Sequence, residues 1–319
     1  MRRIDAAAVH RALGYAALVD RLEQAFRRGC ELPVRHHHAL KIPDGPEATL
    51  LLMPAWRVGG RFGVKIVTVF PGNAAKSLPA VLGLYLLGDA TTGEPLALID
   101  GPSLTVRRTA AASALASRYL SRPEAETMLM VGAGALAPHL IGAHAATRPI
   151  RRVSIWARDI EKARALAQTF KGAAFSATPV KNLEEAASGA DIVSCATLSR
   201  EPLIKGDWLK PGAHLDLVGA FTPEMRESDD AAVMRARVFV DTRAGALKEG
   251  GDVVQPLRSG ILRPEGVLAD LFELTRGEKK GRQSAAEITL FKSVGSALED
   301  LAAAELAAER AAERPAERA

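Results

Sequence analysis

Residues 127–137 read Thr127-Met-Leu-Met-Val-Gly-Ala-Gly-Ala-Leu-Ala137 and carry the strongest local signal in the chain. The first five of these residues predict a short buried strand, and the G-x-G-x-x-A pattern that follows is typical of a tight turn into a helix. Gly132 would make the turn, Gly134 would let a pyrophosphate approach the backbone, and Ala137 would let the helix pack closely on the strand. A plain tight turn is the alternative, because one glycine pattern alone is weak evidence. In this context the stretch predicts dinucleotide binding.

Downstream, the chain alternates between strand and helix patterns. The expected strands are 127–131, 152–156, 190–196, 213–219 and 237–241, and the expected helices are 135–146, 159–170 and 182–188. Such alternation predicts right-handed βαβ units and a parallel sheet, which is an α/β fold of the Rossmann type.

Upstream, the pattern is different. Residues 14–28 predict an amphipathic helix that ends at Gly29, and apolar runs at 49–53, 61–70, 81–88 and 95–100 predict a mostly antiparallel sheet. An alanine-rich helix over 103–120 is expected to link the two regions. A second alanine-rich helix near the C-terminus should end in a solvated, partly frayed tail from Ala307 onward.

Composition excludes several classes of protein. The net charge of +5 is spread along the chain and only 5% of the residues are aromatic, which argues against nucleic-acid binding. Cys30 and Cys195 are expected to be reduced packing residues. No signal-peptide core or membrane-spanning stretch is seen, so we expect a cytoplasmic protein that binds no membrane.

Arg158 follows the second expected strand, where an NAD site would commonly place a carboxylate for the ribose hydroxyl. Its guanidinium could pair with a 2′-phosphate or stack on adenine, which favours NADPH while leaving NADH possible. Asp159 is explained more simply as the N-cap of the next helix. A solvated loop arginine is the alternative.

Three basic residues outside the nucleotide fold lie in apolar or structured surroundings: Arg35, Lys65 and Arg108. Convergent cations are what a substrate carboxylate needs, although spacing alone does not show that these three converge. His36-His-His38 invites a metal interpretation, but neighbouring strand residues point to opposite faces and no partner stands at a ligand spacing. We therefore expect no metal.

Several ordered motifs resemble the ornithine cyclodeaminase/μ-crystallin family: Gly63-Val-Lys-Ile-Val67, Arg108-Thr-Ala-Ala-Ala-Ser113, Val131-Gly-Ala-Gly-Ala135, Gly189-Ala-Asp-Ile-Val193, Val240-Asp-Thr-Arg243 and Leu290-Phe-Lys-Ser-Val-Gly295. The resemblance runs from Arg35 to the Asp300 region. It implies a homodimer in which a Rossmann domain, residues 122–285, is inserted into a discontinuous α+β substrate-binding and dimerisation domain, residues 1–121 and 286–319.

The resemblance also implies site residues. Arg35, Lys65 and Arg108 match the positions that hold the substrate carboxylate, and Lys65 and Arg108 are the catalytic candidates. The residues expected at the cofactor are Thr109, Gly132, Gly134, Ala135, Leu136, Ala157, Arg158, Ala196, Thr197, Ser293 and Val294.

One departure from the cyclodeaminase pattern is informative. Where cyclodeaminases carry an aspartate and, four residues on, a lysine, this chain has Phe221 and Met225. The segment resembles instead the branch that reduces Δ1-pyrroline-2-carboxylate and Δ1-piperideine-2-carboxylate to L-proline and L-pipecolate, with Phe221 in the substrate pocket. Ala80 replaces a threonine found in many relatives, which removes one polar substrate contact. The alternatives are an alanine-type amino-acid dehydrogenase, an ornithine cyclodeaminase and a non-enzymatic binding protein like the μ-crystallins.

Overall fold

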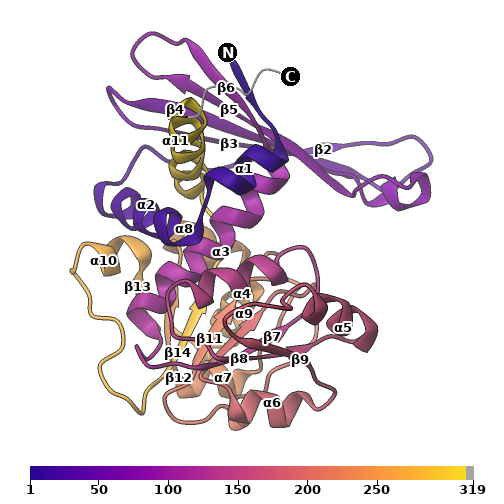
Figure 1. The fold of residues 1–319 in the computed structure, drawn as a ribbon, viewed down its shortest axis with the longest axis vertical. Coiled ribbons are helices and arrows are strands. Elements are labelled where there is room, and N and C mark those ends of the chain that lie inside the picture. The colour runs from indigo at the N-terminus through magenta and orange to yellow at the C-terminus, as the bar shows by residue number, and fades with distance from the viewer. Residues whose placement is uncertain (314–319) are drawn as a thin grey trace. The chain divides into compact units, whose positions relative to one another are not determined.

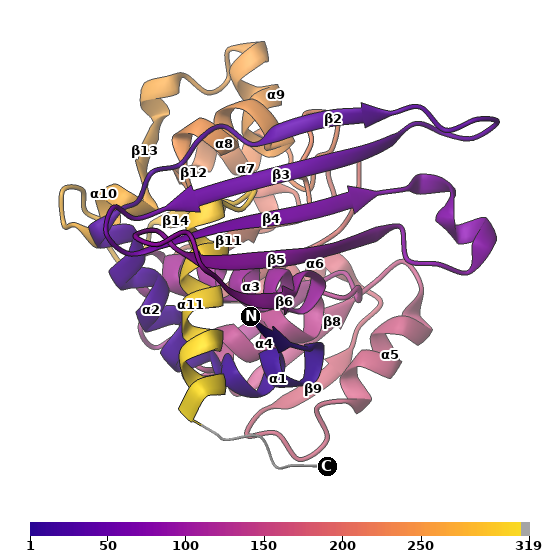
Figure 2. The ribbon, with the colours of Figure 1, turned by 90° about the horizontal axis from the view of Figure 1, so that it is seen from above.

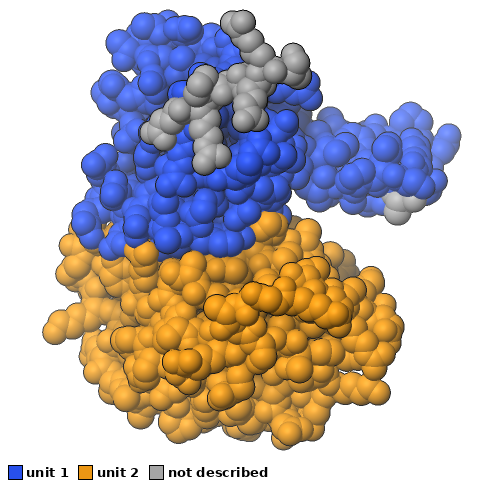
Figure 3. Space-filling view, in the orientation of Figure 1, with its two compact units in different colours: residues 1–108, 296–319 blue, residues 109–295 orange. Residues whose placement is uncertain are grey.

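The computed structural model describes residues 1–313, which divide into two compact units (Figure 3). Unit 1 contains Met1–Arg108 and the segment from Ser296 onward, and unit 2 contains Thr109–Gly295. Helix α3 (Gly101–Leu120) continues across the first division. The domain boundaries expected near residues 121 and 285 stay a prediction.

Unit 2 is built on an eight-stranded sheet in which every pair of neighbouring strands is parallel (Figure 1). The strand order is β13-β12-β14-β11-β10-β7-β8-β9. The chain runs from β7 outward through β8 to β9, then returns to the other side of β7 with β10. In an open parallel sheet, ligands bind at such a reversal, outside the carboxyl ends of the strands. The expected α/β class with a Rossmann-type sheet is confirmed.

The elements of unit 2 have the following bounds: β7 (Thr127–Val131), α4 (Ala137–Ala145), β8 (Arg152–Trp156), α5 (Ile160–Gln168), β9 (Ser176–Pro179), α6 (Leu183–Gly189), β10 (Ile192–Cys195), β11 (His214–Leu217), α7 (Asp230–Arg235), β12 (Ala236–Val240), α8 (Arg243–Glu249), α9 (Gly251–Ser259), β13 (Val267–Asp270), α10 (Leu271–Thr275) and β14 (Ile288–Lys292). Strands β10, β11 and β14 are buried along their whole length. Helices on both faces of a parallel sheet produce this burial and the near-continuous apolar runs of its strands.

Unit 1 contains a six-stranded sheet of order β1-β6-β5-β4-β3-β2, antiparallel except where β1 joins β6. Its elements are β1 (Arg2–Ile4), α1 (Ala6–Ala12), α2 (Tyr15–Arg28), β2 (His36–Leu40), β3 (Ala48–Trp56), β4 (Arg61–Val69), β5 (Val81–Asp89), β6 (Pro95–Asp100) and α11 (Ala297–Glu313). Gly29 ends α2 with a φ of 77°, as expected of a C-cap glycine.

The two faces of the unit 1 sheet differ. Helix α11 packs on β3, β4 and β5, and α2 packs beside α11 (Figure 2). Met53, Lys65, Tyr85 and Ile99 share a cross-strand row on this covered face and are buried. The opposite face keeps apolar side chains partly open to solvent.

The expectation of a solvated, partly frayed tail from Ala307 is only partly right for the residues that the structure describes: Glu309 and Ala312 are exposed, but the chain is not frayed there. Helix α11 runs on to Glu313, with Ala307 buried. Arg310 donates to the Ala12 carbonyl at 2.8 Å, and Glu309 accepts from Arg21 at 3.0 Å. An alanine side chain is buried wherever another element packs closely against it. The alanine-rich repeat therefore gave no sequence pattern that would indicate the packed side of the helix. Residues 314–319 lie outside the described part.

Within residues 1–313, we find no helix that is both long enough and apolar enough to span a bilayer.

Candidate functional site

A hollow of about 700 Å³ opens at the carboxyl ends of β7, β8 and β10, where the sheet order reverses. Several of the residues expected at the cofactor line it together: Gly132, Gly134, Ala157, Arg158, Ala196 and Thr197. Other expected residues do not line this hollow: Thr109, Ala135, Leu136, Ser293 and Val294. Thr109 lies on α3, Leu136 is the N-cap of α4, and Ser293 and Val294 follow β14.

The glycine turn has the form that a pyrophosphate requires. Gly132 has a φ of 110°, and a Cβ there would stand 2.6 Å from the Ala196 carbonyl oxygen. A Cβ on Gly134 would meet nothing within 4 Å, so the backbone there faces open space. Helix α4 begins at Ala137, and the positive end of its helix dipole favours an anion there. These residues fit a dinucleotide.

Three basic residues line the same hollow as the glycine turn: Arg158, Lys162 and Arg200. Arg158 is exposed after β8, while the next residue, Asp159, caps α5 by accepting from Glu161 N at 3.0 Å, as expected. Lys162 and Arg200 were not predicted at the cofactor site, because the sequence around Lys162 is typical of a solvent-exposed helix position and that around Arg200 is typical of a loop.

Two buried carboxylates hold the loops that follow the central strands. Asp241 Oδ2 accepts from Val294 N at 2.7 Å and Gly295 N at 2.6 Å, just after β14. Glu227 accepts from Thr197 N at 2.6 Å and Gly219 N at 2.8 Å, after β10 and β11. Neither carboxylate was expected from sequence. The signal in the sequence that could have indicated them is an acidic residue within a segment that has no solvent-exposed face.

The second cluster of interest lies in unit 1. Lys65 on β4 forms an ion pair with Asp300 on α11, at 2.7 Å between Nζ and Oδ2. Arg108 donates from Nε to Asp300 at 2.9 Å and from Nη1 to Glu299 at 2.8 Å. All four side chains are at most 6% exposed. Buried charges of this kind are expensive unless paired and hydrogen-bonded, so the arrangement needs a reason.

The electrostatics of this cluster suit an anionic ligand. Burial lowers the pKa of Lys65 to about 8; Asp300 opposes the shift, while Arg108 and Arg35 add to it. Arg35, which precedes β2 and is half-buried, is therefore near enough to Lys65 to act on its charge. Burial lowers the pKa of Arg108, but Asp300 and Glu299 raise it by more, so this residue stays a cation.

Glu299 and Asp300 were not expected as site residues. They stand in the first turn of α11, nearly two hundred residues after Arg108. Acidic residues favour a helix N-terminus for reasons of charge alone, which gives them an ordinary explanation in the sequence.

Phe221 lies two residues after Gly219 and is 49% exposed, and Met225 follows it in the same loop. His36 and His38 lie on β2 and are exposed, with their rings nearly perpendicular and 6.2 Å apart between centroids. The described part of the chain holds no cluster of His, Cys, Asp or Glu that could bind a metal ion.

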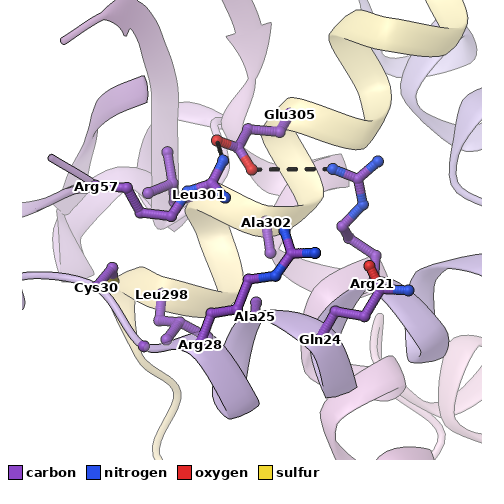
Figure 4. Close-up of a pocket in the computed structure, with 11 residues that line it drawn as sticks. Arg21, Gln24, Ala25, Arg28, Cys30, Arg57, Leu298, Leu301, Ala302 and Glu305 are labelled. Carbon is purple, nitrogen blue, oxygen red and sulfur yellow. Dashed lines mark hydrogen bonds and ion pairs between the residues drawn. The ribbon is translucent and has the colours of Figure 1, made fainter. Parts of the chain in front are cut away.

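A small cavity in unit 1 is lined by Arg21, Arg28, Arg57 and Glu305 (Figure 4). Figure 4 shows Arg57 and Arg21 both paired with the Glu305 carboxylate. Glu305 and Glu309 pair with these two arginines, and none of the three expected carboxylate-binding residues lines the cavity, so we do not assign it to substrate.

Comparison with known proteins finds a matching family and several similar proteins. Residues 4–315 match the model described as the ornithine cyclodeaminase/mu-crystallin family. The chain is 42% identical over 279 residues to a Delta(1)-pyrroline-2-carboxylate reductase of Paracoccus denitrificans, which covers 87% of this chain and 88% of the relative.

Two solved structures are similar over nearly the whole chain. The Thermococcus litoralis Delta(1)-pyrroline-2-carboxylate reductase, in complex with NADH and L-proline, has a TM-score of 0.91, 33% identity and 98% coverage of each chain. An archaeal alanine dehydrogenase dimer with bound NAD has a TM-score of 0.88 and 30% identity, and covers 98% of this chain and 96% of its own.

Proposed function

Because this chain belongs to the ornithine cyclodeaminase/mu-crystallin family, we propose that it is an NAD(P)H-dependent reductase of cyclic imino acids. Its substrates are Δ1-pyrroline-2-carboxylate and Δ1-piperideine-2-carboxylate, and its products are L-proline and L-pipecolate. Relatives named for the first of these activities, one of them with NADH and L-proline bound, support the assignment. The buried Lys65–Arg108 pair is the observation that carries it.

In this proposal the substrate carboxylate binds Lys65, Arg108 and Arg35. Asp300 accepts from Nε of Arg108 and Glu299 accepts from Nη1, and we infer that Nη2 donates to the substrate carboxylate. Glu299 and Asp300 keep the guanidinium in one orientation before substrate arrives, which lowers the entropic cost of binding. The nicotinamide supplies the hydride that reduces C2 of the imine. Lys65, with a pKa of about 8, is a cation at neutral pH and a candidate for protonating the ring nitrogen; water is the alternative.

For the cofactor we infer a preference for NADPH. Arg158 and Lys162 line the hollow after β8, where the adenosine ribose of a dinucleotide lies in this fold, and neither the β8 end nor Ala157 offers a ribose-binding carboxylate. Asp159 lines the hollow as well, but its carboxylate caps α5.

For assembly we infer a homodimer that uses the uncovered face of the unit 1 sheet. Leu52, Ile66 and Leu84 form one cross-strand row on that face, and Leu50 and Leu82 belong to the next. Leu82 is 43% and Leu84 36% exposed. A contiguous apolar sheet face is typical of an interface, and a second copy of the chain fits it because the alanine dehydrogenase neighbour is a dimer.

The free thiols Cys30 and Cys195 support a reducing, cytoplasmic location.

The experiment that tests the function is an assay of NADPH and NADH oxidation over a panel of five- and six-membered cyclic imino acids. A second candidate, the reductive amination of a keto acid, is favoured by the similarity to alanine dehydrogenase, so pyruvate with ammonia is assayed in parallel. Faster oxidation with a cyclic imine supports the proposal. Faster oxidation with pyruvate and ammonia replaces it with the dehydrogenase, and no oxidation with either leaves a binding protein.

A further inference from the structure

Glu227 connects two loops at the cofactor end of the unit 2 sheet. Its Oε1 accepts from Thr197 N at 2.6 Å and Thr197 Oγ1 at 2.8 Å, and its Oε2 accepts from Gly219 N at 2.8 Å and Ala220 N at 3.3 Å. One carboxylate therefore takes four donors, two from the end of β10 and two from the end of β11. The side chain is fully buried.

The two loops are in close contact where Glu227 joins them. A Cβ on Gly219 would stand 2.1 Å from the Thr197 carbonyl oxygen and 2.6 Å from Glu227 Oε1, so only glycine fits. Thr197 itself lines the hollow, and its Cγ2 lies 3.3 Å from the position of a Cβ on Gly132 in the phosphate-binding turn. Gly219 and Ala220 lead directly into Phe221. A displacement of Glu227 would thus reach both sides of the site.

The surroundings of Glu227 contain one cation and one further anion. Lys292 on β14 lowers the pKa of the Glu227 carboxyl, and Asp252 on α9 raises it. Lys292 Nζ and Asp252 Oδ2 are 3.4 Å apart, and Asp252 Oδ1 accepts from Glu227 N at 2.8 Å. Cys195 on β10 also faces this group, but burial raises the pKa of its thiol well above the usual value, so it stays neutral.

We propose that Glu227 is a positioning residue for cofactor binding: as a carboxylate it draws Thr197 and the Gly219–Phe221 segment into the geometry that receives the nicotinamide end of the dinucleotide. The inference rests on the proposed function only in taking the hollow to be the cofactor site.

The proposal has a consequence for pH. Burial raises the pKa of Glu227 to about 7, with Lys292 and the Thr197 hydrogen bonds acting in the opposite direction. An ionised carboxylate accepts all four hydrogen bonds, whereas the protonated acid must turn one oxygen into a donor that faces an N–H group. Affinity for the reduced cofactor should therefore fall as the pH drops below about 7 and recover above it.

The test is the dissociation constant for NADPH and NADH, followed by the fluorescence of the reduced cofactor from about pH 5.5 to about pH 8.5, for the full chain and for Glu227→Gln. The amide cannot accept four hydrogen bonds, so Glu227→Gln should bind about tenfold more weakly at pH 8 and lose the pH dependence. Asp216→Asn is the matched control. Asp216 is an equally buried carboxylate on β11 that accepts from Ser113, Ser194 and His144 instead of from the backbone of Thr197 or Gly219. This control should be less stable but keep the pH profile.

Thr197→Val serves if Glu227→Gln does not fold. This substitution removes only the Thr197 hydroxyl. In the native chain the hydrogen bond from that hydroxyl lowers the pKa of Glu227, so its loss should raise this pKa and move the pH midpoint of cofactor binding upward. A wild-type binding curve that is flat across this pH range, or a midpoint that stays in place in Thr197→Val, overturns the proposal. Since cofactor binding is measured without any imine, failure of the proposed reductase activity leaves this test intact.

Discussion

Arg108 is bound by two carboxylates before any substrate arrives, so removing it affects both catalysis and folding. We expect Arg108→Ala to lose about 2 to 4 kcal/mol of transition-state stabilisation in kcat/KM for the imine, because a charge-assisted contact to the substrate carboxylate is lost. The same change leaves Glu299 and Asp300 buried with Lys65 as the remaining cation, so the melting temperature should fall as well. Steady-state kinetics and thermal unfolding measure the two effects.

Arg107 provides the control for this prediction. It is adjacent in α3 but donates to His10 Nδ1 at 3.0 Å and to the Leu13 carbonyl at 3.3 Å, and stacks over Tyr15. Arg107→Ala should lower stability with little change in kcat/KM. Loss of cofactor binding in Arg108→Ala with unchanged substrate kinetics would place Arg108 outside the substrate site.

Arg158 allows the cofactor preference to be tested. Only NADPH presents a 2′-phosphate, so Arg158→Ala should weaken the use of NADPH much more than that of NADH. The measurement is kcat/KM for each cofactor at a fixed imine concentration. Arg152→Ala is the control, because Arg152 is an exposed arginine on β8 that does not line this hollow. Equal losses for both cofactors would indicate adenine stacking or a structural role, and no loss would indicate a solvated side chain.

Phe221 and Met225 predict which reaction the chain does not catalyse. Cyclodeamination of L-ornithine moves several protons, and a phenyl ring neither donates nor accepts one. An apolar ring also leaves the distal ammonium of ornithine without a partner, at a cost of several kcal/mol if that end is buried. Incubation with L-ornithine and catalytic NAD⁺ should therefore form proline and ammonia far more slowly than the imine is reduced. Comparable rates would sink the assignment to the reductase branch.

At the residue scale, the chemical suitability of a side chain was easier to predict than the groups that it contacts in the fold. The types of Lys65 and Arg108 only made them suitable for a carboxylate, and the family resemblance joined them with Arg35 into one expected site, which stays a prediction. The glycine turn indicated a dinucleotide. Glu299, Asp300 and Glu227 were missed because a carboxylate acquires its role from groups that folding brings to it, and these groups are remote in the sequence or are backbone N–H groups.

At the scale of elements, the spacing of apolar residues and the positions of glycine and proline predicted most of the strands and helices. Alternating apolar positions and the glycines that end α2 and shape the turn after β7 are local signals, so their consequences are visible in the sequence. Helix α11 shows the limit. Its alanines carry almost no hydrophobic pattern, and its packing on the unit 1 sheet depends on residues that the chain reached some two hundred positions earlier.

Glu305 tests how firmly α11 is held. It accepts a hydrogen bond from Arg57, just after β3, and its carboxylate lies 4.0 Å from the Arg21 guanidinium on α2. Only 7% of its side chain is exposed. Glu305→Gln should lower the free energy of unfolding by about 1 to 3 kcal/mol, because it removes a charge that two arginines share in a poorly hydrated place. Glu309→Gln, whose side chain is 51% exposed, should cost less than about 1 kcal/mol. Urea unfolding compares the two, and equal effects would show that burial of Glu305 has no energetic weight.

At the scale of the whole molecule, the strand order of each sheet was beyond sequence analysis. The return of the chain from β9 to β10 across β7 depends on long-range pairing, and no residue marks it locally. The covered and uncovered faces of the unit 1 sheet were equally hidden, because both faces of β5 are apolar: Tyr85 and Leu87 on one side, Leu82 and Leu84 on the other.

The proposed dimer follows from that uncovered face and can be tested by one charge. In a two-fold interface each residue occurs twice, so Leu84→Arg would bring two guanidinium groups onto an apolar surface with no acceptor added. Burying an unpaired charge costs several kcal/mol, which is enough to separate a dimer of ordinary affinity at micromolar concentration. We expect the wild type to sediment as a dimer and Leu84→Arg as a folded monomer, with folding checked by thermal unfolding. Val58→Arg is the control: Val58 is 88% exposed in the turn between β3 and β4, so a charge there costs little and the assembly should be unchanged. A wild type that is a monomer, or a Leu84→Arg variant that still sediments as a dimer, would require another explanation for the exposed leucines of β5.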